Sequence, residues 1–163
     1  MSDAPKLGLT TGRQTVTAVL SGAVVGYLVV SLFEMTGGFP PIVPWSVPIV
    51  VFVLSVAGFV YAKTLPKRLD GKRVSSREAL AALVSAKAMI MTGAILAGGH
   101  VVYVMRYIQM MHAPSPSARV VHGSVTIVAS LILAGVGAVL ERACVVPEGP
   151  DDDDEDGPLP AAS

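Results

Sequence analysis

Two side chains capable of chemistry, Lys87 and His100, interrupt a run that is otherwise apolar, small or weakly polar, ALVSAKAMIMTGAILAGGHVVYV at residues 82–104. The run can cross a bilayer, because ~20 residues at a helical rise of ~1.5 Å span a hydrocarbon core of ~30 Å. A charge at mid-depth costs ~2.5–3.5 kcal/mol on insertion scales, so such groups tend to be functional. The Lys87 amine could bind an anion, a carbonyl or a partner's carboxylate. Alternatively, its stem lies along the helix and the amine reaches the inner headgroups or Glu141.

Counting residues along the chain gives the depth of Lys87 relative to the acidic groups. Lys87 follows Arg77 by ten residues, which places it at most ~15 Å from the inner boundary. We expect Glu34 to differ from it in depth by ~16 Å, too far for an ion pair, and Glu141 to lie ~13 Å below it, within reach only at full extension. The groups predicted at matching depth are the hydroxyls of Ser21, Ser55, Ser130 and Ser85.

Small residues at helical spacing predict which face of this span meets another helix. Lys87, Ala94 and Gly98 lie at i, i+7 and i+11 and share one stripe. Small residues let helices approach closely, and two other apolar segments carry matching sets, Ala18, Gly22 and Gly26 in one and Ser130, Ala134 and Ala138 in the other. We therefore expect Lys87 to face protein rather than lipid. The candidate functional or packing residues are Lys87, Ala94, Gly98, Gly22, Gly26 and Ser130.

The histidines suggest one further hypothesis for function, which is metal handling. His100, His112 and His122 fall toward the same side as Glu34 and several methionines, and these ligand types suit copper or zinc. No histidine pair has the i, i+4 spacing of a helical site, however, and His112 lies in a Pro-rich segment. No metal ligand is therefore predicted.

Sequence motifs of enzymes are missing as well. The sequence contains no phosphate-binding loop, dinucleotide fingerprint, zinc-protease motif or nucleophile elbow. We predict that the protein is not an enzyme, with no catalytic residue, no cofactor and no nucleic-acid partner.

The elements that would position these side chains are four apolar segments, at about residues 16–33, 42–62, 79–105 and 123–140. Hydrophobic residues make up 52% of the 163 residues and charged residues 15%, a composition that indicates a membrane protein. Backbone groups in lipid must be satisfied within their own segment, so the spans should be helices. The predicted fold class is all-α, a four-span transmembrane helix bundle with a disordered acidic C-terminal tail.

Turn residues predict how the spans connect. TGGFPPIVP should close the first two spans into a tight antiparallel hairpin that packs against a hairpin of the last two. APSPSA at residues 113–118 should separate the third and fourth spans. Ser75 should cap the third span, with Glu78 at the third helical position.

Charge divides the chain into a basic body and an acidic end. Residues 1–147 carry all 12 Lys and Arg and five acids, a net charge of +7, whereas residues 148–163 carry seven acids and no base. Nine bases flank the spans on one side and two on the other, so the positive-inside rule places both termini in the cytoplasm. We predict a cytosolic N-terminus at 1–14, a transmembrane domain at 15–142 and an acidic disordered tail at 143–163.

Three stretches carry a family resemblance: PPIVPW after the first span, SAKAMIMTGAILAGGH in the third, and LERACVVPEGPDDDDED after the fourth. In this order, along nearly the whole chain, the sequence resembles the actinobacterial family called domain of unknown function 3180. The resemblance implies a small four-span integral membrane protein of a high-GC Gram-positive bacterium, and it brings no catalytic residues with it.

These observations lead to two hypotheses for a multi-pass protein of the bacterial cell membrane. The leading one is a non-enzymatic accessory or scaffold subunit of a membrane assembly, in contact with the lipid bilayer and with a membrane-protein partner or a second copy of itself. The alternative is a small homo-oligomeric transporter or channel subunit that binds an anionic group at Lys87. No small-molecule substrate can be identified from the sequence.

Overall fold

Four long helices contain most of the residues that the structure describes. The computed structural model describes residues 9–70, 75–112 and 114–144, with elements α1 (Gly12–Met35), α2 (Ser46–Asp70), α3 (Ser76–Tyr107), the 3-10 helix η1 (Ile108–Met110) and α4 (Pro114–Ala143). All four α-helices are long and apolar enough to cross a membrane. The predicted all-α, four-span fold is therefore confirmed. The tail predicted to be disordered lies, beyond residue 144, outside the described residues.

The helices begin where local chemistry favours a helix start. Ser75 accepts a hydrogen bond from the backbone N–H of Glu78, which confirms the predicted cap of α3. Thr11 caps α1 through reciprocal bonds with Gln14. Residues 114–118, expected to separate two spans, instead form the first turns of α4. Proline is tolerated there because N–H groups of a first turn have no partner within the helix.

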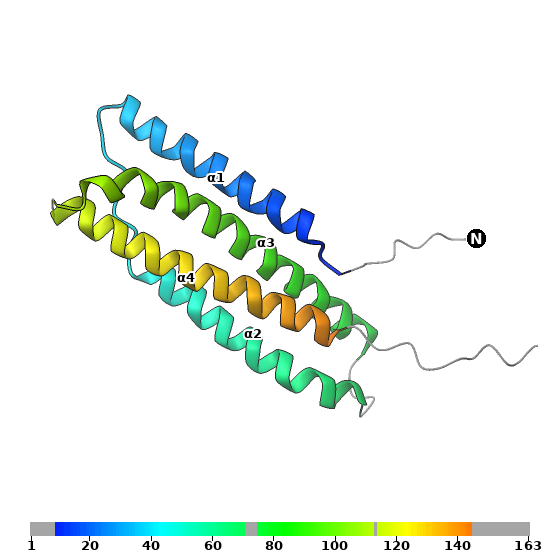
Figure 1. Cartoon of the computed structure of the whole chain (residues 1–163). Coiled ribbons are helices and arrows are strands. Elements are labelled where there is room, and N and C mark those ends of the chain that lie inside the picture. Colours follow the sequence, from blue (N-terminus) through cyan, green and yellow to red (C-terminus); the bar gives the residue numbers. More distant parts are fainter. Residues whose placement is uncertain (1–8, 71–74, 113, 145–163) are drawn as a thin grey trace, which may run out of the picture.

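Residues 36–45, named the outer loop after the predicted orientation, connect α1 to α2. Gly37 has a φ of 72°, a left-handed conformation that glycine adopts without steric penalty just after a helix. Prolines then keep the segment extended, so α2 begins at Ser46 rather than at residue 42. The loop leads from α1 at one edge of the molecule to α2 at the other (Figure 1).

The helices lie side by side in the order α1, α3, α4, α2 (Figure 1). α3 packs on both α1 and α4, and α2 packs on α4, so α1 and α2 occupy opposite edges. The predicted tight hairpin of the first two spans is therefore wrong, because the outer loop is long enough to carry α2 past α3 and α4. α1 and α3 run parallel as a result.

Glycines set the spacing at both seams of α3. Gly26 faces Gly99 of α3, and a Cβ on Gly26 would lie 2.7 Å from the Gly99 carbonyl oxygen. On the other side of α3, Gly137 of α4 lies against Ala86 and Ile90. A side chain at these positions would collide with the neighbouring backbone, so the close approach of the helices depends on glycine.

Large apolar side chains cover the outside of the row. Exposed examples on three helices are Leu28, Leu32, Phe52, Val128 and Leu131. The buried positions are instead rich in small residues such as Ala86, Ala94 and Ala129. An apolar exterior around a small-residue interior is the arrangement that suits a lipid environment.

Candidate functional site

One carboxylate oxygen gathers three donors at the end of the row where α1 begins and α4 ends. The Lys87 Nζ donates to Oε1 of Glu141 at 2.7 Å, and the backbone N–H and hydroxyl of Thr10 donate to the same oxygen at 2.9 and 2.8 Å. The Lys87 Nζ also lies 3.4 Å from the Thr10 hydroxyl oxygen. These three residues, named the inner junction, tie the residue before the α1 cap to the last turn of α4 through an amine on α3.

Burial makes the inner junction more than a surface ion pair. The Glu141 side chain is 4% exposed and that of Lys87 is 27% exposed. A carboxylate removed from solvent must be neutralised or hydrogen-bonded, and Lys87 and Thr10 supply both. Lys87 therefore faces protein, as the small-residue stripe predicted, and its amine lies on a carboxylate of the same chain.

Register explains why Lys87 and Glu141 meet. The predicted depth difference of ~13 Å is wrong, because it assumed that the first base of α3 and the last base of α4 lie at one depth. Gly137 lies against Ala86, so Glu141, one turn further along α4, comes within about one helical turn of Lys87. At the end of the row that carries the inner junction, the first turns of α3 therefore extend past the last turn of α4.

Two of the hydroxyls expected beside Lys87 bond within their own helices. Ser55 donates to the Val51 carbonyl at 2.8 Å, and Ser130 donates to the Thr126 carbonyl at 2.7 Å. Such bonds to the residue four positions back satisfy a hydroxyl in apolar surroundings. The hydroxyl that contacts Lys87 belongs to Thr10, which sequence reasoning missed because Thr10 precedes the predicted span.

The small residues singled out in the sequence lie in two different seams. Gly22 and Gly98 lie in the α1–α3 seam, where each meets backbone atoms of the other helix. Ala94 is 2% exposed. Ser130 lies in the α3–α4 seam, where its carbonyl faces Gly93. The predicted packing faces thus meet, but Ser130 lies away from the α1–α3 glycines.

Three side chains of α3 and α4 fasten the outer loop. Each donates to a loop carbonyl: Arg119 to Pro40, Tyr103 to Pro41 at 3.2 Å, and His122 to Val43 at 2.6 Å. A Pro-rich segment has few N–H groups to build regular structure, so its carbonyls need donors from elsewhere. Sequence reasoning counted Arg119 only as a base on the outer side, and nothing in its spacing indicates this contact.

Aromatic rings complete the environment of the fastened loop. Arg119 is 8% exposed, and its guanidinium carbon lies 5.2 Å from the centre of the Tyr107 ring, a distance that allows cation–π attraction. Trp45 packs on His122 with ring centres 4.4 Å apart. Packing of this kind holds the end of the loop, where α2 starts, against α4.

A second ion pair joins α1 and α3 at the loop end. Arg106 Nε donates to Oε1 of Glu34 at 2.7 Å, with side chains 53% and 37% exposed. Its N–O distance equals that of the Lys87–Glu141 pair, but its side chains are much more exposed. Ion pairs that are screened by solvent in this way add little stability.

The histidines do not converge on one another. His122 bonds to the outer loop, whereas His100 Nδ1 lies 2.8 Å from the Leu96 carbonyl oxygen of its own helix. Within residues 9–70, 75–112 and 114–144, no three His, Cys, Asp or Glu side chains are grouped as metal ligands. The metal hypothesis therefore gains no support from the described part of the chain.

Cys144 follows the last residue of α4. Burial raises the pKa of its thiol, and the nearby Glu141 carboxylate raises that pKa further. The thiol is therefore mainly protonated at neutral pH, which makes it a poor nucleophile.

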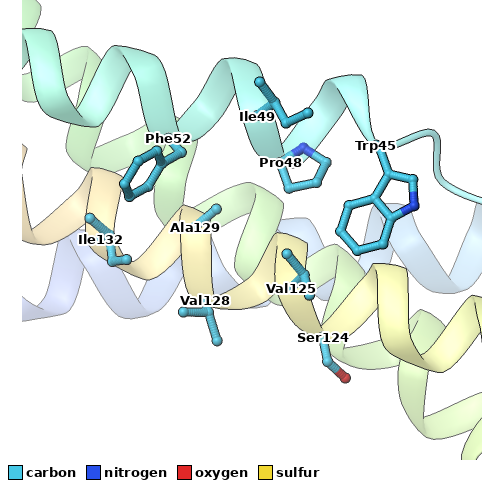
Figure 2. A pocket seen from close by; sticks show the side chains of 9 residues that line it. All are labelled: Trp45, Pro48, Ile49, Phe52, Ser124, Val125, Val128, Ala129 and Ile132. Carbon is cyan, nitrogen blue, oxygen red and sulfur yellow. The ribbon is translucent and has the colours of Figure 1, made fainter.

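An apolar groove of about 510 Å³ runs between α2 and α4 near the outer loop. Figure 2 shows Trp45 at the end of the outer loop, and Pro48 and Phe52 of α2, along one side, with the Ser124 hydroxyl turned away from them. The side chains facing the groove are hydrocarbon apart from the indole. Such a surface suits an acyl chain or a helix and has little means of selecting a polar group.

These features define the class of the protein. Four apolar helices, tied together at both ends by polar contacts, form a multi-pass α-helical membrane protein. The family model described as "Protein of unknown function (DUF3180)" matches residues 15–148, and the chain belongs to this family. The resemblance seen in the sequence is thereby confirmed. Comparisons with curated proteins and with solved structures found no match.

Proposed function

We propose that this protein is a non-enzymatic accessory or scaffold subunit of a membrane assembly. The observation that carries the proposal is the use of its buried charges. Glu141 is bonded to Lys87 and Thr10, and Arg119 is bonded to the outer loop. These groups fix helices and loop to one another. The surface left for contact with other molecules inside the membrane is the apolar side of the row, which suits packing against a further helix.

The same reasoning weighs against the alternative, a small homo-oligomeric transporter or channel subunit that binds an anionic group at Lys87. An incoming anion would have to displace the Glu141 carboxylate, which lies 2.7 Å from the amine and carries the same charge. Lys87→Met separates the two functions. Under our proposal, anion flux into vesicles that contain the variant equals that of the wild type. A loss of flux while the variant still inserts would favour the transporter.

We also propose that the protein resides in the bacterial cell membrane with both termini in the cytoplasm. The support is the distribution of bases. Lys63 and Arg77 lie near the end of the row that carries the inner junction, and Arg106 and Arg119 lie near the other end. Combined with the bases outside the described residues, this imbalance is the kind that sets orientation.

Site-specific photocrosslinking in native membranes tests the scaffold function. A photoreactive residue is placed at Leu28 of α1, 59% exposed, and at Val128 of α4, 57% exposed, as a matched position on another helix. If the protein is a subunit of an assembly, we expect a discrete protein adduct from one of the two positions and lipid adducts from the other. An adduct of twice the chain mass identifies the partner as a second copy. Lipid adducts alone from both positions would contradict the proposal.

A further inference from the structure

A second groove, with a volume of about 320 Å³, lies between α1 and α3. Gly22, Gly26 and Gly99 line it along the α1–α3 seam, and Val25 and Val29 of α1 line one side. The volume falls at the low end of the ~300–1,000 Å³ that is usual for small-molecule sites. It suits a single chain or ring better than a lipid with two chains.

The groove is almost entirely apolar, and the two polar side chains that line it, His100 and Tyr103, lie toward its outer end. Its lining follows α3 from Ile95 to Tyr103, a length of ~12 Å. Pro40 and Pro41 of the outer loop line the outer end, and their carbonyls already accept bonds from Arg119 and Tyr103. An amphiphile would therefore place its head group toward the outer loop and its tail toward the middle of the membrane.

His100 supplies an acceptor in the outer half of the groove. Its Nδ1 lies 2.8 Å from the Leu96 carbonyl oxygen, and since a carbonyl only accepts, Nδ1 carries the hydrogen. In the neutral ring, Nε2 is then an acceptor, on the ring edge directed away from its own helix backbone. No donor among the described residues reaches Nε2. A hydroxyl group on a ligand would satisfy it.

We propose that the α1–α3 groove binds a single-chain amphiphile with a hydroxyl head group, a long-chain or isoprenoid alcohol, whose O–H donates to Nε2 of His100. The α2–α4 groove of Figure 2 is the contrasting case: it is larger, and its facing side chains offer no comparable acceptor. This inference goes beyond the scaffold function and does not depend on it.

The test compares farnesol with farnesyl methyl ether, which has the same chain but no hydroxyl donor. Binding of each to the purified full-length protein in nanodiscs is measured by competition against a photoreactive dodecanol, and labelled peptides are mapped by mass spectrometry. We expect labels on the α1 and α3 segments that line the groove. One hydrogen bond predicts that the ether binds about three- to tenfold more weakly than farnesol. His100→Phe, which keeps a ring but removes the acceptor, should abolish that difference.

Two tryptophan variants on α1 keep the test independent of His100. Val25→Trp narrows the groove and should reduce labelling, whereas Val24→Trp, on the same helix but outside the groove lining, should leave labelling unchanged. Both positions are exposed, so neither change disturbs a buried contact. Equal binding of alcohol and ether to the wild type, or equal effects of the two tryptophans, would overturn the proposal.

Discussion

Glu141→Ala should destabilise the protein far more than the loss of the Arg106–Glu34 ion pair. The Lys87–Glu141 and Arg106–Glu34 pairs have the same N–O distance of 2.7 Å. They differ in burial, since the carboxylate side chain of Glu141 is 4% exposed and that of Glu34 is 37% exposed. Burial, rather than distance, should therefore decide the outcome.

The contacts at the inner junction set the expected size of the effect. Removing one partner of a buried ion pair costs about 3–5 kcal/mol. The Lys87 side chain is 27% exposed, so in the variant its amine can turn toward the headgroups. The expected loss of stability in Glu141→Ala therefore lies near the lower limit of this range, about 3 kcal/mol. Glu141→Gln keeps an oxygen acceptor for Thr10 and should cost only about 1–2 kcal/mol.

A double-mutant cycle isolates the contact itself. Lys87→Met leaves the Glu141 carboxylate with only Thr10 as its donor among the three junction residues, so it should also destabilise. The double variant Lys87→Met/Glu141→Gln should lose less than the sum of the single changes, with a coupling energy of about 0.5–3 kcal/mol.

The assay is reversible unfolding of the full-length protein in mixed micelles with increasing SDS, followed by helical circular dichroism. Glu34→Gln is the matched control and should leave the transition almost in place, because the pair it breaks is exposed. The reasoning is refuted if Glu141→Ala destabilises no more than Glu34→Gln, or if the Lys87 and Glu141 changes are additive.

Three further predictions concern the glycines, Arg119 and Cys144. Gly22→Leu should force α1 away from α3 and destabilise by about 1–3 kcal/mol or more in the same SDS titration, whereas Gly135→Ala, with nothing within 4 Å of the added carbon, should be neutral or slightly stabilising. Arg119→Ala should free the outer loop, seen as faster proteolysis within it, and an unchanged cleavage rate would show that Arg119 does not hold the loop. Because burial and the Glu141 charge both raise the Cys144 pKa, alkylation of this thiol by N-ethylmaleimide should rise only at alkaline pH. Glu141→Gln should shift that pH profile toward lower pH, and a profile that stays in place would contradict the electrostatic contribution.

The sequence was sufficient for features that depend on one segment at a time. Hydropathy located the four spans, and the spacing of Gly22 and Gly26 identified a face that does pack on α3. The Ser75 cap is likewise a property of a few adjacent residues. Lys87 was correctly expected to face protein because its stripe is made of small residues.

Features that depend on how helices align with one another could not be predicted in this way. The Lys87–Glu141 contact follows from an offset between α3 and α4 that glycine contacts fix, and no residue count along either helix reveals it. The helix order depends on where the outer loop is fastened. Its donors include Arg119 and His122, which are distant from the loop in sequence. Hydropathy carries no information about such long-range pairs.

The central claim is that the chain crosses the membrane four times with both ends on the inner side, and topology reporters test it most directly. Green fluorescent protein and alkaline phosphatase are fused in turn behind Ser163, and again behind Thr36 in chains truncated after the first span. The account predicts fluorescence without phosphatase activity behind Ser163, and phosphatase activity without fluorescence behind Thr36. Phosphatase activity behind Ser163 would contradict it.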